Sequence, residues 1–337
     1  MCGKKMKTII GIDGGIGRVI TAIPALLKYG KNHPDDEWYI SVGAWEYCFW
    51  GIEELQKRVI NPEMKGIFET IFWDADQVIQ PEPYKEPQYY RNEISLSEAF
   101  DKTINNTDDH SDLPDIKMET RLVENMFVKE LMGKMAMSVY GDNGWQNRKW
   151  IVIQPYGSMA SSSNLGIYDK SLRSIPDSFM KNILDGLKSD YNIINMSAAN
   201  NFSVFEGIIN DPTEYDMRTW ISIIKQADYF IGCDSCGQHI AKGVGTDASV
   251  FIAGTHEVNV SYPDDFHIIK NSEKFYPSPI RISNWTCELS EKLNEKRMVF
   301  SEEEQDEQIE TVIGRIKAVP KRKKPKTLED VHCCSRC

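Results

Sequence analysis

The sequence predicts an α/β protein made of two halves, each with a parallel β-sheet flanked by helices. Three observations support this prediction. Residues 7–42 read as strand, glycine turn, helix and strand, which is the pattern of a βαβ unit. The same alternation resumes at residue 150 and continues to residue 253. Between the two series, the turn-forming segment Gly-Asp-Asn-Gly at 141–144 interrupts the chain.

In the first half, the apolar run KTIIGID at 7–13 stops at two glycines and is expected to form a buried strand. The segment VITAIPALLKY at 19–29 has helical spacing, with Pro24 at a kink or near the helix start. The segment EWYISV at 37–42 is expected to be the next strand. Together these elements give a parallel sheet with a crossover helix.

Residues 80–118 differ in composition, because they contain four prolines and pairs of Asn and Asp. They are predicted to form an irregular insertion with one short helix around 97–102. Residues 119–140 then carry apolar side chains at helical spacing, which predicts a long helix with a buried stripe.

The second half repeats the α/β alternation. Strands are expected at 150–154, 191–196, 229–232 and 249–253, and helices near 177–189, 217–226 and 302–317. The predicted organisation is an N-terminal domain at 1–145, a C-terminal domain at 146–300, a helix at 301–318, and a tail at 319–337 that is basic (KRKKPK) and cysteine-rich (HCCSRC).

Composition limits the class of protein. A hydrophobic content of 41% and a charged content of 26% are typical of a soluble globular protein, and the net charge of −11 argues against a broad nucleic-acid-binding surface. No apolar run reaches the roughly 18 residues of a membrane span, and the N-terminus does not read as a secretory signal. The eight cysteines are therefore expected to be reduced thiols of a cytoplasmic protein.

The first glycine turn, GIDGGIGRV at 11–19, fits neither of two familiar phosphate-binding patterns. A P-loop needs a Gly-Lys-Ser/Thr ending, and a dinucleotide fingerprint needs a third glycine where Ile20 stands. What remains is a strand-to-helix turn that lets another molecule approach the backbone. A turn with a purely structural role is the alternative.

The second glycine turn, GCDSCGQHIAKGVG at 232–245, follows a predicted parallel strand. Asp234 or Ser235 is positioned to cap a helix that begins near Gly237, with His239 in its first turns. The carboxyl end of such a strand is where open α/β sheets bind ligands, and a helix N-terminus favours anions. The pattern predicts a seat for a phosphate or diphosphate, although His239 has a structural alternative.

The cysteines leave other hypotheses open. Cys233 and Cys236 form one Cys-x2-Cys pair, and Cys334 and Cys337 form another, next to His332 and Cys333. The two pairs together, or the tail alone, have the ligand types of a zinc site. A redox role for Cys233 and Cys236, or a small residue packed at Cys236, are the remaining alternatives.

Two segments together resemble the heptosyltransferase-like glycosyltransferases (family 9, GT-B fold). GRVITAIPALLKYGKNHPDDEWYI resembles their first βα unit, G-D-x-x-x-T-x-P-A-L followed by H-P-x-A-x-I. ADYFIGCDSCGQHIAKGVGTDASVFIAG resembles their signature A-D-x-x-x-G-x-D-S-G-x-x-H-L-A-x-A-x-G. The signature matches are Ala227, Asp228, Gly232, Asp234, Ser235, His239, Ala241 and Gly245.

This resemblance implies a GT-B fold, with two Rossmann-like domains facing a cleft, and inverting sugar transfer from a nucleotide-sugar to an acceptor hydroxyl. It implies no cofactor other than the nucleotide-sugar co-substrate, and no metal. By analogy, the donor diphosphate lies against the loop of the second domain, here Asp234, Ser235, Cys236, Gly237 and His239. YDKSLRSIP loosely matches a basic element of the family, so Lys170 or Arg173 is expected to meet a phosphate.

The sequence departs from the family at the catalytic base, an aspartate that is replaced here by Arg18. Arginine does not accept a proton. Asp13 is the nearest carboxylate and the expected substitute, with Asp74 or Asp76 as alternatives, and Arg18 would instead hold an acceptor phosphate or the donor. Cys236 replaces a glycine of the motif, which is tolerable if its φ is negative.

The expected function is therefore an inverting glycosyltransferase. The expected acceptor is a glycan such as the lipopolysaccharide core, and a modified base of a nucleic acid is a minor possibility that the basic tail at 321–326 suggests. The same tail is compatible with peripheral membrane contact or with a solvated end. A nucleotide-sugar-binding protein without catalysis and a nucleotide-sugar epimerase are the alternative functions.

Overall fold

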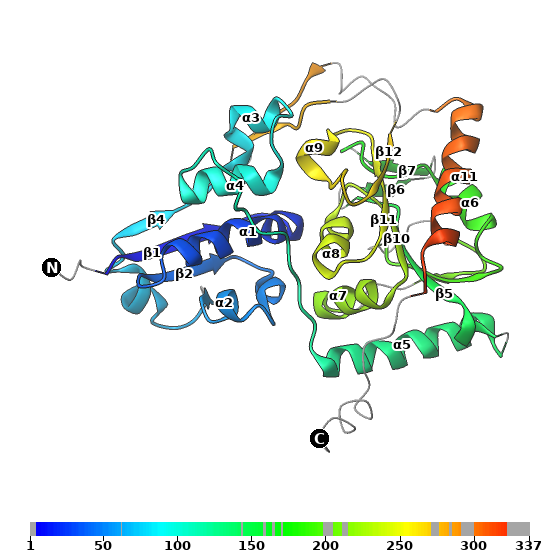
Figure 1. Cartoon of the computed structure of the whole chain (residues 1–337), viewed down its shortest axis with the longest axis horizontal. Coiled ribbons are helices and arrows are strands. Elements are labelled where there is room, and N and C mark those ends of the chain that lie inside the picture. Colours follow the sequence, from blue (N-terminus) through cyan, green and yellow to red (C-terminus); the bar gives the residue numbers. More distant parts are fainter. Residues whose placement is uncertain are drawn as a thin grey trace. The chain divides into compact units, whose positions relative to one another are not determined.

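The computed structural model describes residues 5–61, 63–142, 144–157, 160–163, 166–169, 171–197, 205–210, 215–270, 276–282, 285–290 and 300–321. The chain divides into two compact units (Figure 1). The first unit contains the described residues of Met1–Glu119, His256–Ser261 and Tyr276–Asn294. The second contains those of Thr120–Thr255, Tyr262–Phe275 and Glu295–Cys337.

The first unit is built on a four-stranded parallel sheet with the order β3-β2-β1-β4. Its strands are β1 (Lys7–Ile12), β2 (Glu37–Val42), β3 (Val59–Ile60) and β4 (Gln77–Ile79). The central strand β1 is apolar and almost wholly buried, as the sequence predicts. Parallel pairing brings the carboxyl ends of β1 and β4 together, so the residues that follow them meet at one edge of the sheet.

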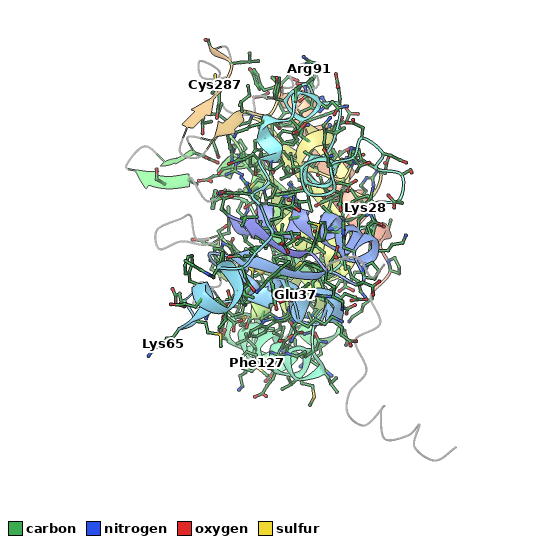
Figure 2. The ribbon with its side chains drawn as sticks, turned by 90° about the vertical axis from the view of Figure 1, so that its left-hand side faces the viewer. Lys28, Glu37, Lys65, Arg91, Phe127 and Cys287 are labelled. Carbon is green, nitrogen blue, oxygen red and sulfur yellow. The ribbon has the colours of Figure 1, made fainter. Side chains whose placement is uncertain are left out.

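Helix α1 (Ile16–Asn32) follows β1 and packs against α4 (Leu96–Asn105). The contact is reinforced by Lys28, labelled in Figure 2, whose buried Nζ lies 3.0 Å from Oδ2 of fully buried Asp101. Asp112 pairs with the same ammonium group. Burial lowers the pKa of Lys28, but hydrogen bonds to Asp112 and Asp101 outweigh this effect and raise it overall. The network fastens the insertion to α1.

The remaining elements of this unit are short. They are η1 (Glu46–Phe49), α2 (Glu53–Gln56), η2 (Phe68–Phe72), η3 (Pro83–Lys85), α3 (Pro87–Tyr90), α9 (Glu257–Val260), β13 (Ile280–Ile282) and β14 (Trp285–Cys287). Two of them, η3 and α3, lie within 80–118 together with α4, so the predicted irregular insertion contains more helix than the sequence suggested.

The second unit is built on a six-stranded parallel sheet with the order β12-β11-β10-β5-β8-β9. The strands are β5 (Lys149–Gln154), β8 (Tyr191–Asn195), β9 (Ile209–Asn210), β10 (Tyr229–Cys233), β11 (Ala248–Ile252) and β12 (His267–Lys270). A two-stranded ribbon of β6 (Ala160–Ser163) and β7 (Gly166–Asp169) follows β5. Strands β5, β8, β10 and β11 are buried throughout or nearly so, which explains their continuous apolar sequences.

Helices cover both faces of this sheet. Helices α7 (Met217–Gln226) and α8 (Cys236–Val244) lie on one face, and α6 (Asp177–Asp185) and α11 (Glu302–Ala318) lie on the other (Figure 1). Ile183, Val312 and Ile316 are in the main apolar cluster beneath the second pair. These elements agree with the sequence-based expectations to within a few residues at each end.

The boundary between the units differs from the expected one at residue 145. Helix α5 (Leu122–Tyr140), assigned from the sequence to the first half, belongs to the second unit because it packs on α7. Glu124 of α5 accepts hydrogen bonds from Nε and Nη2 of Arg218 at 3.1 and 2.6 Å. Phe127 of the same helix is exposed (Figure 2).

Two late segments belong to the first unit, although the sequence placed them in the second half. Asn259 of α9 donates from Nδ2 to the carbonyls of Tyr89 and Ile94, at 2.6 and 2.8 Å. Arg281 of β13 lies over the ring of Tyr84, 5.2 Å from its centroid. Because these contacts join residues far apart in the chain, sequence patterns within single segments do not reveal them.

Candidate functional site

Asp234 follows β10 and organises the carboxyl edge of the second sheet. Its side chain is buried and accepts hydrogen bonds from Gln238 at Oδ1 and from Thr255 at Oδ2, both at 3.0 Å. Gln238 belongs to α8 and Thr255 to the loop after β11. The carboxylate therefore fixes the start of the helix against the neighbouring loop. The backbone carbonyl of Asp234 accepts a separate hydrogen bond, from Arg173.

The first turn of α8 is packed closely against β5. Gln154 at the end of β5 accepts a hydrogen bond from the Gly237 N–H at 2.9 Å, and its amide nitrogen lies 3.7 Å from Cys236 Sγ. A Cβ at Gly237 would come within 2.3 Å of Gln154 Oε1 and 2.5 Å of the Phe230 ring. The structure therefore gives Gly237 a packing role, and its N–H is already engaged within the protein.

Ser235 is the N-cap residue of α8, with an extended backbone and no capping hydrogen bond from its side chain. Cys236 begins the helix and has no positive φ, so its replacement of glycine is accommodated. Burial raises the pKa values of the Cys233 and Cys236 thiols, which disfavours the thiolate forms that redox exchange or metal binding requires.

His239 lies one turn into α8 and is buried, with 6% of its surface exposed. Its Nδ1 lies 2.6 Å from the Tyr262 hydroxyl, and the two rings meet edge to face. Burial lowers the pKa of His239 to about 4 and raises that of Tyr262 well above its usual range. At neutral pH both side chains are uncharged, so His239 offers a hydrogen bond rather than a positive charge.

The positive charge at this edge comes from Arg173. Its Nη1 donates to the Asp234 carbonyl at 3.2 Å, and its Nε donates to Ser171 Oγ at 3.0 Å. Arg173 and the α8 loop were predicted separately from the sequence, and the structure brings them together. Lys170, the other predicted basic residue, lies outside the described residues.

A buried carboxylate, Asp169, shapes the loop that carries Arg173. It accepts hydrogen bonds from the N–H groups of Ser171, Arg173 and Ser174 and from both serine hydroxyls. Burial alone would raise the pKa of Asp169, but these hydrogen bonds outweigh it and lower the pKa. Leu172 takes a φ of +56° within this loop. The loop packs closely on Gly254, because a Cβ added at Gly254 would lie 3.1 Å from the carbonyl oxygen of Leu172.

At the carboxyl edge of the first sheet, Asp13 and Arg18 form an ion pair, with Arg18 Nη2 2.9 Å from Asp13 Oδ1. The Asp13 side chain is 55% exposed, and that of Arg18 is 11% exposed. Gly14 has a φ of +89°, and a Cβ there would lie 3.1 Å from Arg18 Cδ. The glycine thus provides both the left-handed turn and room for the arginine stem.

The structure adds Glu82 to this pair, a residue that the sequence analysis missed. Glu82 follows β4, and its Oε2 lies 3.9 Å from Arg18 Nη2. The register that places Ile10 opposite Ile79 brings the residue after β1 close to those after β4. Predicting a strand at 77–79 from the sequence would have indicated that Glu82 lies near Arg18, but three residues are too few to show a strand pattern.

The alternative bases Asp74 and Asp76 lie at the other edge of the same sheet. Asp74 pairs with Lys7 Nζ, and Asp76 Oδ2 accepts from the Lys7 N–H at 3.0 Å. Lys7 begins β1 whereas Asp13 follows its end, which separates the two places by roughly 20 Å of extended strand. Neither carboxylate therefore substitutes for Asp13 at the glycine turn.

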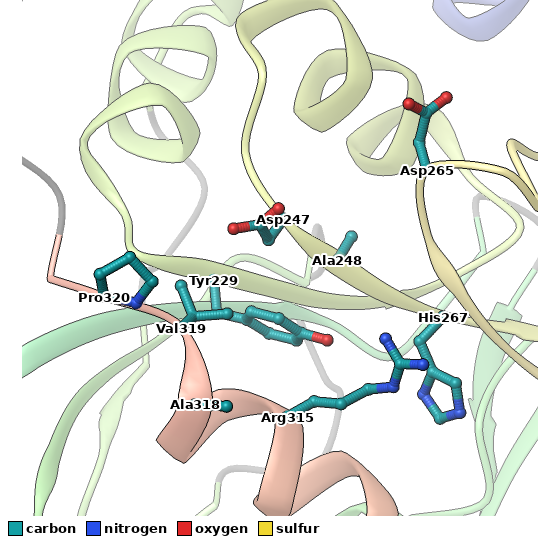
Figure 3. Close-up of a pocket in the computed structure, with 9 residues that line it drawn as sticks. All are labelled: Tyr229, Asp247, Ala248, Asp265, His267, Arg315, Ala318, Val319 and Pro320. Atoms are coloured by element: carbon teal, nitrogen blue, oxygen red, sulfur yellow. The ribbon is translucent and has the colours of Figure 1, made fainter.

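The second unit also has a cavity of about 310 Å³ at the amino edge of its sheet. The first residues of β10, β11 and β12 line it, together with Arg315 and the chain that follows α11 (Figure 3). Tyr229 bonds to Ser249, and Ser249 to His267, within its wall. This cavity is at the opposite edge from Asp234 and Arg173.

Among the described residues, no group of three or more His, Cys, Asp or Glu side chains is arranged to hold a metal ion. His332, Cys333, Cys334 and Cys337 of the alternative zinc site lie outside those residues. In the part of the chain that the structure describes, no helix is both long and apolar enough to cross a membrane.

No protein-family model and no curated protein matches the sequence. Several solved structures are similar to the model. One is a glycosyl transferase of family 9 from Veillonella parvula, with a TM-score of 0.62 and 12% identity over 94% of this chain and 99% of that one. Another is the ADP-heptose lipopolysaccharide heptosyltransferase II of E. coli, with a TM-score of 0.57 and 10% identity over 92% and 98% of the two chains.

A third similar structure is the dodecameric, iron-containing heptosyltransferase TibC from enterotoxigenic E. coli, in complex with ADP-D-β-D-heptose. Its TM-score is 0.58, with 10% identity over 93% of this chain and 77% of that one. These comparisons confirm the predicted fold class, an α/β protein of the GT-B type. The resemblance drawn from the two sequence motifs is thus confirmed at the level of the fold.

Proposed function

We propose that this chain is an inverting glycosyltransferase that moves a sugar from a nucleotide-sugar donor to a hydroxyl group. One observation carries the proposal. In a fold that the chain shares with glycosyltransferases, Arg173 lies at the N-terminus of α8, at the carboxyl edge of a parallel sheet. A guanidinium beside a helix N-terminus is suited to a diphosphate, and this edge is where such sheets bind ligands.

On the donor side, the proposed role of Arg173 is to stabilise the negative charge that grows on the leaving diphosphate. Asp169 and Asp234 hold the arginine and the helix in place, so little reorganisation is needed during the reaction. The proposed tautomer of His239 accepts a hydrogen bond from the Tyr262 hydroxyl at Nδ1 and carries its proton on Nε2, where it would donate to a phosphate oxygen. The neutral imidazole then contributes a hydrogen bond without adding charge.

On the acceptor side, Asp13 is the proposed general base. Its carboxylate takes the proton of the acceptor hydroxyl as the oxygen forms a bond to the anomeric carbon. The bond between that carbon and the diphosphate oxygen breaks with its electron pair, and the nucleoside diphosphate leaves. Attack opposite to the leaving group inverts the anomeric configuration.

The proposed donor is a nucleotide-sugar, and the complex of TibC with ADP-heptose makes ADP-sugars the first to test. A glycan such as the lipopolysaccharide core is the proposed acceptor, ahead of a modified nucleic-acid base. A thermal-shift screen of UDP-, ADP-, GDP- and CMP-sugars identifies the donor. Because the proposed mechanism assigns charge stabilisation to Arg173 and α8, we expect a chelator to leave the transfer rate unchanged.

The variant Asp13→Asn tests the reaction. Loss of the base should lower kcat by about 10²- to 10⁴-fold, while donor affinity measured by calorimetry stays the same. An exposed acid of the same unit, Glu93, provides the control variant Glu93→Gln, which should keep full activity. Full transfer activity in Asp13→Asn would remove Asp13 from its proposed role.

The arginine at position 18 favours a second candidate function, a nucleotide-sugar-binding protein without catalysis. The family places a base where this chain has Arg18, and Arg18 is paired with Asp13. The discriminating measurement is nucleotide release from a bound donor when hydroxylated acceptors are supplied. Binding without any release over a broad acceptor panel would support the second candidate.

A further inference from the structure

Helix α5 of the second unit has apolar side chains on more than one side. Val128 and Met132 are buried, and the helix packs on α7. Val123 and Phe127 are also large and apolar, but 67% and 55% of their surfaces are exposed (Figure 2). A surface helix ordinarily has a single apolar stripe, and a helix that is apolar on several sides is normally covered on several sides.

The exposed apolar residues lie along one line of the helix. Successive residues of an α-helix are about 100° apart, so positions two apart are about 200° apart. Glu130 is two positions from both Val128 and Met132, and it therefore lies on the side remote from these buried residues. Residues within about 60° of the line through Glu130 and Lys134 form what we call the outer face of α5. The outer face consists of Val123, Met126, Phe127, Glu130, Lys134 and Met137.

The charges and the large apolar side chains of the outer face are placed symmetrically about the level of residue 132. Glu130 and Lys134 are each two residues from that level, and their side chains form an exposed ion pair of 2.6 Å within the helix. Phe127 and Met137 are each five residues from it, one on either side. Reversal of the helix direction about this level exchanges the acid with the base, and the phenylalanine with the methionine.

We propose that the outer face of α5 binds a second copy of this chain, with the two α5 helices antiparallel about a two-fold axis at the level of residue 132. Glu130 of each copy then lies opposite Lys134 of the other, and Phe127 lies opposite Met137. A two-fold interface must be complementary to itself, and the outer face meets this condition in its charges and in its apolar residues. The proposal is independent of the proposed function.

The charge of α5 favours a second copy over a lipid surface or a nucleic acid. The charged residues of the helix are two acids and two bases, so it has no net charge: Glu124, Lys129, Glu130 and Lys134. Helices that lie on membranes are typically rich in Lys and Arg, and nucleic-acid binding needs an excess of positive charge. Because the whole chain has a net charge of −11, the opposite charges at the contact also offset the general repulsion between two copies.

The expected complex is weak and reversible. A helix of 19 residues is about 28 Å long, and one such helix on each side buries less than the roughly 1,600 Å² of a standard interface. We therefore expect a dissociation constant of about 1–100 μM. Sedimentation velocity of the full chain at about 1 to 200 μM measures it. Phe127→Glu places a carboxylate opposite Met137 of the other copy and should weaken the dimer at least about 10-fold.

A charge exchange tests the antiparallel arrangement itself. Glu130→Lys alone and Lys134→Glu alone each place like charges opposite one another, and each should weaken self-association at least about 10-fold. A mixture of these two variants has opposite charges at both contacts and should associate about as well as the unaltered chain. Lys129→Glu is the matched control, because it makes the same change of charge at an exposed residue outside the outer face and should change the dissociation constant less than about threefold.

Thermal denaturation of each variant checks that the fold is kept, which is expected because the substituted side chains are exposed. Three results would overturn the proposal: a chain that is monomeric at every concentration, a dimer that Phe127→Glu leaves unchanged, or a variant mixture that does not associate. Vesicles of phosphatidylcholine and phosphatidylglycerol test the other occupant. Binding to these vesicles that Phe127→Glu abolishes, without self-association in solution, would assign the outer face to lipid and would also overturn the proposal.

Discussion

The carboxyl edges of the two sheets are built in opposite ways. In the second unit, Asp169, Asp234 and Gln154 are buried and accept hydrogen bonds that fix the surrounding loops. In the first unit, the corresponding edge has an exposed carboxylate, Asp13, paired with an arginine. The edge of the second sheet thus consists of buried, hydrogen-bonded side chains, and the edge of the first sheet has an ion pair with an exposed carboxylate.

This difference suggests a division of labour between binding and proton transfer. A diphosphate site benefits from donors held in advance, because no free energy is then spent on ordering them. A general base must be reached by the acceptor hydroxyl, and so it must be exposed in the free protein. Substitutions at the two edges should therefore have different consequences, which the following variants measure.

The largest expected contrast is between Asp169→Asn and Asp13→Asn. An asparagine at position 169 would place its side-chain NH₂ group against the N–H and hydroxyl groups that now donate to Asp169. The free energy of unfolding should therefore fall by about 3–5 kcal/mol, and the affinity for the nucleotide-sugar should fall with it. Asp13→Asn removes a half-exposed carboxylate from Arg18, which keeps the Pro81 carbonyl and Glu82 as partners, and should cost about 1 kcal/mol. Chemical denaturation of both variants gives the comparison. Equal losses would contradict the proposed difference between the edges.

The pH dependence of stability should come from two histidines of the second unit, buried His239 and partly buried His267. Burial lowers the pKa values of His239 and His267 to about 4, below the unfolded value of 6.5. The unfolded chain thus binds more protons, so their contribution is complete above pH 6.5 and is lost as the pH falls toward 4. For His239 it amounts to at most about 3 kcal/mol.

Unfolding measured at several pH values should therefore show a weaker acid dependence in His239→Gln than in the unaltered chain. The half-exposed His33, which pairs with Asp36, provides the control variant His33→Gln. An acid limb that His239→Gln leaves unchanged would mean that His239 is not buried in the neutral form.

A smaller contrast is expected at two glycines. Gly237→Ala forces a Cβ against Gln154 and Phe230, so it should cost about 1–3 kcal/mol. At the other edge, a Cβ at Gly15 meets no atom within 4 Å, and Gly15→Ala should cost less than about 1 kcal/mol. Thermal denaturation measures both. A larger cost at Gly15 would show that the first edge is packed as tightly as the second.

Much of the fold was predictable from the sequence because its central strands are continuous apolar runs that end at glycine or aspartate. The strand at 37–42 and the helix at 217–226 were predicted with the bounds that the structure has. The insertion was less predictable, although a capping box formed by Ser95 and Glu98 marks the start of α4. That signal was present in the sequence and was overlooked.

The candidate site was predictable only where its residues are close in sequence. Residues 234–239 form one motif, and the resemblance added Arg173. The sequence did not predict the roles of Asp169, Gln154 and Glu82, because their partners lie on other strands or loops. Only the folded structure brings these residues and their partners together. The role of Gly237 also differed from expectation, because its N–H is bonded to Gln154.

The most direct test of the central claim is the affinity for the nucleotide-sugar, measured by calorimetry, in Arg173→Gln and Arg315→Gln. Both variants remove one guanidinium from the second unit, at the carboxyl and the amino edge of its sheet. Loss of a charge-assisted hydrogen bond at Arg173 should weaken binding by about 10- to 100-fold, whereas Arg315→Gln should leave it within about twofold. Equal affinity in Arg173→Gln and the unaltered chain, or a loss confined to Arg315→Gln, would contradict the proposed donor site.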